Sequence, residues 1–523
     1  MGGCSARVNF PTPRSLGLPP QYTEWRAHQE EAIKVIDASK SPVVALMLPP
    51  GAGKSLIYMA YSVWRNLRVC VLTSNRLLQT QIFNDFASLG VVDIRGQANY
   101  DCIVSGGKVS EGPCHGGFEC ADKDNGGCDY FSLLRRIKDE RLVSTNYSFW
   151  LHNKNLMGQF DLVVCDEGHA ALDQLANHLS ITLTRAEVDK YCHRHPFASW
   201  RTWAGFEKTW LESQLKGLKS FPKTEALFAE IVVVKRMLEK VTTLSGLDEA
   251  TYIYQRKPSS WSWENVWPGA HRSRMFSNSK RFLVTSGTLT HQTMSLLGFR
   301  ESEYDYHAFP CTFPVRRRPI IILPAPRMTL RSSQSEHAQW LRLHDEWIST
   351  RPGRGVIQAG SYDRTERLVS ESKHKKRMIC NLNANGLPEA LERYLATEGA
   401  ILVSPSVTEG ANFPYEACEW EIISKVPFPN PSDPVVAARV TQYGGYLNYC
   451  AAQSIVQSSF RGMRAIDDYC EVAIIDGTWQ EWFYSKARDH FPLYFQDAIF
   501  PQAAVPPGKK RIFKKNLVVR RIS

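Results

Sequence analysis

Long apolar runs are missing from this 523-residue sequence, and the stretch before residue 20 lacks the apolar core of a signal peptide. No run approaches the roughly 18 residues that cross a bilayer. We therefore expect a cytoplasmic or nucleoid-associated protein. The 13 cysteines are an odd number and follow no export signal, which argues against a disulfide framework.

What is present is ordinary for a globular chain with a moderate basic bias. Hydrophobic residues make up 43%, charged residues 22%, and the formal net charge is +11. At about 150 residues per domain, the length predicts roughly three or four domains. The charge suits a polyanion partner such as nucleic acid without demonstrating one.

The most informative stretch is the glycine-rich segment LPPGAGKS at 48–55. It follows an apolar run at 42–47 that predicts a buried parallel strand, and it precedes a predicted helix. Proline replaces the first glycine of the usual Walker A pattern. A strand, a glycine turn and a helix still form a phosphate cradle, with backbone N–H groups and a lysine on the phosphates and a hydroxyl on Mg²⁺. The expected ATP and Mg²⁺ contacts are Gly51, Ala52, Gly53, Lys54 and Ser55.

Polar residues stand one turn upstream of this strand. Arg26 and Gln29 open a predicted helix and could read a purine edge of ATP, because a Gln amide both donates and accepts. A polar helix face is the alternative interpretation.

A second predicted strand, 69–73, ends in Ser74 and Asn75, ahead of a predicted helix at 76–86. Polar groups at the carboxyl end of a parallel strand often bind ligands. These two residues either contact a nucleic acid phosphate or cap the helix.

Two adjacent carboxylates follow a third apolar strand at 160–165. Asp166 can hold Mg²⁺, and Glu167 can orient and deprotonate the attacking water, as in a Walker B strand. The pattern D-E-G-H at 166–169 therefore predicts the hydrolytic half of the ATP site.

Four cysteines crowd a glycine-rich segment that has too little apolar content to build a core. They are Cys102, Cys114, Cys120 and Cys128, separated by 11, 5 and 7 residues. Metal coordination would order such a segment. Paired C-x₂-C knuckles are missing, which disfavours a zinc finger or ribbon, whereas a Cys₄ iron–sulfur cluster tolerates irregular spacing. Four unrelated free thiols are the alternative.

Taken together, these motifs resemble the XPD/DinG family of iron–sulfur superfamily 2 helicases. Besides the P-loop and D-E-G-H, the resemblance rests on R-G-x-x-N-Y-x-C from 95, T-N-Y at 145–147, S-G-T-L at 286–289, 355–362, E-G-A-N at 409–412, 425–434 and Q-S-S-F-R-G-M-R at 457–464. The match runs in order from Arg26 to about Asp476. Phe460 stands where the family has glycine, and Asn412 where it usually has aspartate.

The resemblance implies an α/β fold with two RecA-like P-loop motor domains, the first interrupted by an iron–sulfur insert and a helical arch. The expected boundaries are a loose N-terminal segment 1–20, first motor domain 21–98, 136–175 and 276–325, iron–sulfur insert 99–135, arch 176–275, second motor domain 326–500, and a basic tail 501–523.

It also implies a function. The chain would be a monomeric ATP-dependent helicase with a [4Fe–4S] cluster, moving 5′ to 3′ on single-stranded DNA and splitting forked DNA, as in DNA repair or replication. Gln457, Arg461 and Arg464 would reach ATP from the facing domain.

Two other functions remain open. The chain could be a DNA-stimulated ATPase that remodels nucleoprotein complexes without unwinding, or a strand-binding scaffold whose motor Phe460 and Asn412 have weakened. In the arch, Trp200, Trp203 and Trp210 could stack bases, although core packing is favoured. The basic tail is either solvated or adds phosphate affinity.

Overall fold

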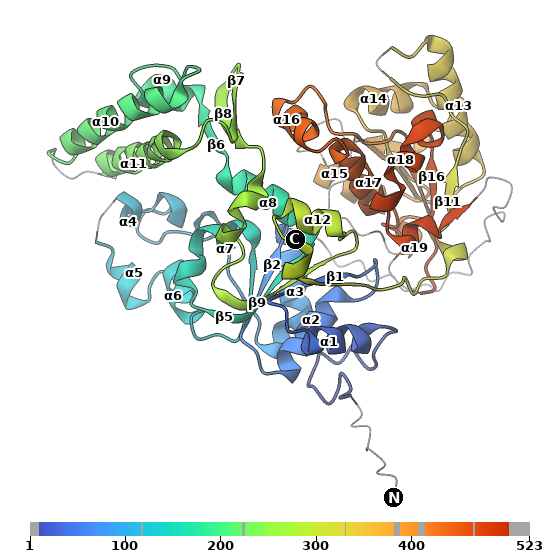
Figure 1. Ribbon diagram of the computed structural model, residues 1–523, viewed down its shortest axis with the longest axis horizontal. Coiled ribbons are helices and arrows are strands. Elements are labelled where there is room, and N and C mark those ends of the chain that lie inside the picture. The colour runs from blue at the N-terminus through green and yellow to red at the C-terminus, as the bar shows by residue number, and fades with distance from the viewer. Residues whose placement is uncertain are drawn as a thin grey trace, which may run out of the picture. The chain divides into compact units, whose positions relative to one another are not determined.

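The computed structural model describes residues 10–116, 119–221, 225–329, 331–380, 387–405, 413, 415–463 and 466–500. The chain divides into two compact units, 1–312 with 428–450 and 313–427 with 451–523. Each unit has its own parallel sheet with helices, which confirms the predicted α/β class (Figure 1). Among the described helices, none combines the length and apolar character that crossing a membrane requires.

The first unit is built on a seven-stranded parallel sheet in the order β10-β1-β9-β5-β2-β4-β3. Its strands are β1 (Val43–Met47), β2 (Val69–Thr73), β3 (Val92–Asp93), β4 (Leu142–Asn146), β5 (Phe160–Asp166), β9 (Ser279–Ser286) and β10 (Asp305–Ala308). Residues of β1 and β2 are buried throughout, as expected of strands covered on both faces. The apolar runs thus located these strands correctly.

Helices of this unit follow the strands. They are α1 (Gln29–Ala38), α2 (Lys54–Trp64), α3 (Arg76–Phe86), α7 (Tyr147–Asn153), α8 (Ala171–Leu179), α12 (His291–Leu296) and α16 (Pro434–Gln442). The side chain of Asn75 accepts a hydrogen bond from Leu78 N at 3.0 Å, so it caps α3. Of the two interpretations of this strand end, the capping role is the one observed for Asn75.

Short helices carry the four-cysteine segment, namely α4 (Pro113–Gly116), α5 (Ala121–Asn125) and α6 (Asp129–Arg136). Arg68, at the start of β2, anchors the return of this segment to the sheet, because its guanidinium donates to the carbonyls of Ile137 and Glu140 at 2.7 and 3.1 Å. The segment is therefore fixed to the first sheet on the side where α6 ends.

The predicted arch consists of a helical pair and a small sheet. It comprises α9 (Arg185–Tyr191), α10 (Trp200–Leu218), α11 (Glu225–Gly246) and the antiparallel strands β6 (Ile181–Thr184), β7 (Tyr252–Lys257) and β8 (Ser260–Asn265). In Figure 1, α10 and α11 lie side by side. Trp200 and Trp203 are buried against Trp263, whereas the ring of Trp210 is 40% exposed. Core packing is thus observed for the first two tryptophans.

The second unit holds a parallel sheet in the order β13-β14-β12-β15-β16-β11-β17. Its strands are β11 (Ile320–Ile322), β12 (Gly355–Gln358), β13 (Met378–Cys380), β14 (Ile401–Ser404), β15 (Trp420–Ile423), β16 (Glu471–Ile474) and β17 (Ile499–Phe500). The helices are α13 (Gln334–Ser349), α14 (Tyr362–Glu371), α15 (Leu387–Ala396), α18 (Tyr484–Ala487) and α19 (Leu493–Gln496), and α17 (Tyr446–Ser458) leads to the arginine motif.

Two details differ from the expected boundaries. Strand β11 pairs with β16 and β17, so the second sheet begins before residue 326. Residues 428–450, expected within the second motor domain, group with the first unit, where the Arg439 guanidinium donates to Val266 O at 2.8 Å. Both depend on long-range contacts that local sequence patterns do not report.

Candidate functional site

The P-loop turn lies between the end of β1 and the start of α2. Gly51 and Gly53 adopt φ angles of 77° and 75°, in the left-handed region that favours glycine. A Cβ on Gly53 would lie 2.4 Å from Nε2 of Gln29, so a larger residue would also displace that side chain. Conformation and close approach both require glycine here.

Arg26 and Gln29 hydrogen-bond the backbone of this turn. Gln29 is buried; its Nε2 donates to Ala52 O at 2.8 Å, and its Oε1 accepts from Arg26 N at 2.9 Å. The Arg26 guanidinium donates to Gly51 O at 3.2 Å. The sequence suggested either a purine contact or a polar helix face for these two residues, and neither interpretation included hydrogen bonds to the P-loop backbone. The purine contact stays a prediction.

At the end of β5, the two Walker B carboxylates lie beside the P-loop lysine. Lys54 Nζ is 2.9 Å from Glu167 Oε1. Glu167 has φ 49°, a conformation that non-glycine residues rarely adopt and that tends to occur at functional sites. Lys54, predicted to bind phosphate, and Glu167, predicted to orient water, thus lie together in the first unit.

Tyr58 connects the two expected magnesium ligands. Its hydroxyl donates to Asp166 Oδ2 at 3.3 Å and also hydrogen-bonds the Ser55 side chain. Burial, followed by repulsion from Glu167, raises the pKa of Asp166 to about 6, although Lys54 opposes the shift. A buried carboxylate beside a hydroxyl, short of positive charge, fits a hard divalent cation with oxygen ligands such as Mg²⁺.

The D-E-G-H turn is joined to the S-G-T-L segment on the adjacent strand β9. His169 Nδ1 lies 2.7 Å from Ser286 Oγ and 3.4 Å from Glu167 Oε2. A Cβ on Gly168 would lie only 2.4 Å from Cγ1 of Val284. Glycine at position 168 is therefore explained by a valine on the neighbouring strand.

The four cysteines of the insert converge. Sulfurs of Cys102 and Cys114 flank Gly112, since a Cβ there would lie 3.2 and 3.7 Å from them. Burial, followed by the sulfur of Cys120 and then those of Cys102 and Cys128, raises the pKa of Cys114. For Cys102, burial raises the pKa, but hydrogen bonds from Ser105 and the Val104 backbone outweigh it and lower the pKa overall. Donors aimed at sulfur favour the thiolate that binds metal.

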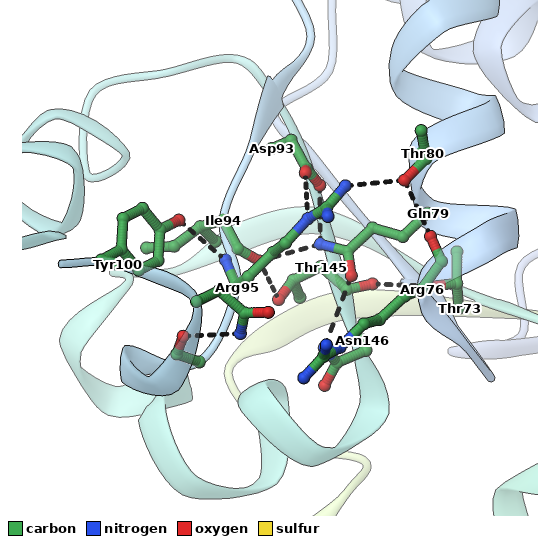
Figure 2. Close-up of polar contacts among 12 residues, drawn as sticks. Thr73, Arg76, Gln79, Thr80, Asp93, Ile94, Arg95, Tyr100, Thr145 and Asn146 are labelled. Carbon is green, nitrogen blue, oxygen red and sulfur yellow. Dashed lines mark hydrogen bonds and ion pairs between the residues drawn. The ribbon is translucent and has the colours of Figure 1, made fainter. Parts of the chain in front are cut away.

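A polar network joins the start of the insert to the motor sheet, and Figure 2 shows it around Arg95. The Arg95 guanidinium donates to Asp93 Oδ2 and Thr80 Oγ1, both at 2.8 Å. The backbone N–H of Arg95 donates to the Tyr100 hydroxyl at 3.1 Å. Gln79 Nε2 donates to Asp93 Oδ1 at 2.6 Å (Figure 2). Since Tyr100 lies two residues before Cys102, the network ties the first of the four cysteines to helix α3.

In the second unit, the arginine motif follows helix α17. Phe460 has φ 63°, the left-handed conformation that glycine adopts without strain, and its ring packs against Tyr494 and Phe495 at 6.3 and 6.0 Å. The bulky residue thus keeps a glycine-like backbone. Arg461 is 6% exposed, and its N–H donates to Glu421 Oε1 at 2.8 Å.

The remaining residues that the sequence predicted for the site lie in several places. Gln457 lies on α17 in the same unit, while Arg464, Asn412 and the basic tail lie outside the described residues. Tyr58 was not singled out from the sequence. Tyr147, whose hydroxyl donates to Asp166 O at 2.9 Å, was named only as part of the T-N-Y motif. Tyr58 lies one helical turn after Lys54, so helix periodicity could have identified it.

Comparisons with known proteins agree with this architecture. The family model for the helicase C-terminal domain matches residues 345–494. A solved XPD helicase is 15% identical, with a TM-score of 0.61, covering 91% of this chain and 99% of that chain. An XPD structure without ligand has 13% identity and a TM-score of 0.59 over 88% of this chain and 98% of that one. An Xpd protein of S. tokodaii has 15% identity and a TM-score of 0.57 over 91% and 100%. No curated protein matches by sequence.

The family model thus identifies a helicase C-terminal domain at 345–494, and the fold of the chain is similar to that of solved XPD helicases. This similarity agrees with the resemblance to the XPD/DinG family that the motifs indicated.

Substituting Gly168→Ala should lower ATP hydrolysis about 10–100-fold, because the added methyl meets Val284 and displaces the adjacent Glu167. The double variant Gly168→Ala/Val284→Ala, in which the Val284 side chain is truncated, should regain most of the activity. Steady-state hydrolysis would be compared with that of Val284→Ala alone. A double variant as impaired as Gly168→Ala would show that the clash is not the cause.

Asp166→Asn should make the nucleotide-free, Mg²⁺-free protein more stable at pH 8, by about 1–3 kcal/mol. The pKa of Asp166 in the folded state, about 6, lies above its ordinary 3.8. Between these two pH values the folded state keeps a proton that the unfolded chain has released. The wild-type free energy of unfolding therefore falls, relative to the variant, as pH rises from about 4 to about 6.

Denaturant unfolding at several pH values measures this effect, and Asp161→Asn is a matched control on the same strand. Hydrogen bonds from Lys280 and the Arg68 backbone lower the pKa of Asp161, so its neutralisation should destabilise the protein. Equal stability of wild type and Asp166→Asn at pH 8 would contradict the electrostatic description.

Proposed function

We propose that this protein is an ATP-dependent DNA helicase that translocates 5′ to 3′ on single-stranded DNA. The observation that carries the proposal is the pairing of Lys54 with Glu167 beside the buried Asp166 carboxylate, within an XPD-like fold. Backbone N–H groups of the Gly51–Gly53 turn would bind the phosphates with Lys54, while Ser55 and Asp166 would hold Mg²⁺. Bound Mg²⁺ supplies charge neutralisation to the phosphates.

The ion pair suggests how hydrolysis is triggered. When a γ-phosphate takes Lys54 as its partner, Glu167 loses its cation and becomes available to orient and deprotonate water. His169 contacts both Glu167 and Ser286, so a change at the carboxylate reaches the S-G-T-L segment directly. Arg26 and Gln29 would keep the phosphate-binding turn in place during this exchange.

We further propose that Gln457, Arg461 and Arg464 approach the nucleotide from the second motor domain. Arginines supplied across a cleft make hydrolysis depend on domain closure, which a bound strand can bias. The glycine-like backbone at Phe460 supports an intact arginine loop rather than a weakened scaffold. The expected domain boundaries, a monomeric motor and a cytoplasmic or nucleoid-associated location belong to the same proposal.

The insert would hold a [4Fe–4S] cluster on Cys102, Cys114, Cys120 and Cys128, a proposal supported by the way these four cysteines lie together and by their irregular spacing in the sequence. The cluster would order a segment with little core of its own. With the arch, it would form the part of the molecule at which forked DNA is split.

Wild-type protein should unwind a fork with a 5′ single-stranded tail and leave a 3′-tailed duplex intact. Lys54→Ala should lose about 100-fold or more of the hydrolysis and all unwinding while still binding single strands, because one phosphate charge is removed from a preformed cradle. Strand separation, ATP hydrolysis and strand binding would be measured together. Unwinding from the 3′ tail alone would refute the polarity, and streptavidin displacement without unwinding would indicate a remodelling ATPase.

Anaerobically purified protein should be brown, with about four irons per chain, because iron–sulfur charge transfer absorbs visible light and zinc does not. Cys114→Ser should bleach the protein and abolish duplex separation while ATP hydrolysis continues. Cys192→Ser, in the arch, is the matched control and should keep iron and colour. A colourless wild type carrying one zinc in the insert would overturn the cluster assignment.

A further inference from the structure

Three buried side chains converge beside strands β15 and β16 of the second unit. Cys418, Glu421 and Cys470 are each 0% exposed, and one ligand atom from each lies within 4.8 Å of the other two. The two sulfurs are 4.0 Å apart, and Cys470 Sγ is 3.4 Å from Glu421 Oε1. Neither the ATP site nor the insert uses these residues.

The distances match the outline of one small ion. With bonds of about 2.3 Å to sulfur and about 2.1 Å to oxygen, a tetrahedral zinc places two sulfurs about 3.8 Å apart and a sulfur about 3.6 Å from an oxygen. The observed separations differ from these by only a few tenths of an ångström.

The carboxylate is already oriented by the backbone. Glu421 Oε1 accepts hydrogen bonds from the N–H groups of Arg461 and Gly462 at 2.8 and 3.3 Å. Its other oxygen, Oε2, is buried and has no hydrogen-bond partner among the described residues. A buried carboxylate oxygen without a partner is costly, and a cation bound by the same carboxylate would offset that cost. Fixing a ligand by a second group is also the usual support of a metal site.

Glycine closes the site. A Cβ on Gly462 would lie 2.3 Å from Cys418 O and 2.8 Å from Cys470 Sγ, so the turn can cover the sulfurs only with glycine at this position. Burial is the largest cause that raises the pKa of both thiols and of Glu421, the last to about 7. The charge of Arg461 opposes the shift at Glu421 but does not cancel it.

We propose that Cys418, Cys470 and Glu421 form a binding site for Zn²⁺, separate from the insert. The two thiols lose their protons to water as the ion binds, and the carboxylate completes a three-ligand protein site. Because Glu421 also receives the N–H groups of Arg461 and Gly462, the ion would stiffen the turn that carries the arginine. This last step rests on the proposed function, whereas the metal site itself does not.

Metal analysis of the full chain tests the proposal. Because the site is enclosed, zinc should enter during folding, so the protein would be produced in zinc-supplemented medium and purified without chelators. We expect about one zinc per chain in addition to iron, with sulfur and oxygen ligands in its X-ray absorption spectrum. Cys470→Ser and Glu421→Gln should lose most of the zinc and keep the iron. Cys380→Ser, in strand β13 of the same sheet, should keep both.

Wild-type protein without zinc would overturn the site, as would zinc that disappears with Cys114→Ser and not with Cys470→Ser. If Cys470→Ser fails to fold, Glu421→Gln decides, because its amide oxygen can still accept the two backbone N–H groups. The readout is metal content rather than hydrolysis, so a failed helicase assay and a missing zinc are separate results.

Discussion

Lys54 and Glu167 are held 2.9 Å apart, and much of the first unit serves to bring these two side chains together. The lysine starts a helix after a turn that only glycines can make, and the glutamate follows the end of β5 in a left-handed conformation. An ion pair at the phosphate position gives each charge a partner before nucleotide arrives. In the proposed mechanism, binding of a phosphate to Lys54 would release Glu167 to act as the base.

The same arrangement costs stability. Asp166 is buried beside another carboxylate, and its raised pKa records the energy of holding charge there without a metal. Glu167 adds backbone strain, and Gly168 leaves no room for a side chain beside Val284. Such features belong to a site that is completed by its ligand, since Mg²⁺ and phosphate would supply the missing partners.

Much of this could be predicted from sequence. Strand β5 and helix α3 were located correctly because a buried strand is a continuous apolar run and a helix has a marked start. The roles of Gln29 and Gly168 could not be predicted, because both depend on contacts with distant segments. The hairpin of β7 and β8 was overlooked, although Trp261 and Trp263 alternate with serines at strand period. The group of Cys418, Glu421 and Cys470 was not predicted, because Cys418 and Cys470 are 52 residues apart in the sequence.

ATP hydrolysis with and without single-stranded DNA tests the central claim most directly. If the Lys54–Glu167 pair is the resting state of a DNA-driven motor, single strands should raise turnover by about tenfold or more, and Lys54→Ala should remove both basal and stimulated hydrolysis. Hydrolysis that is unchanged by DNA, or that survives in Lys54→Ala, would contradict this account.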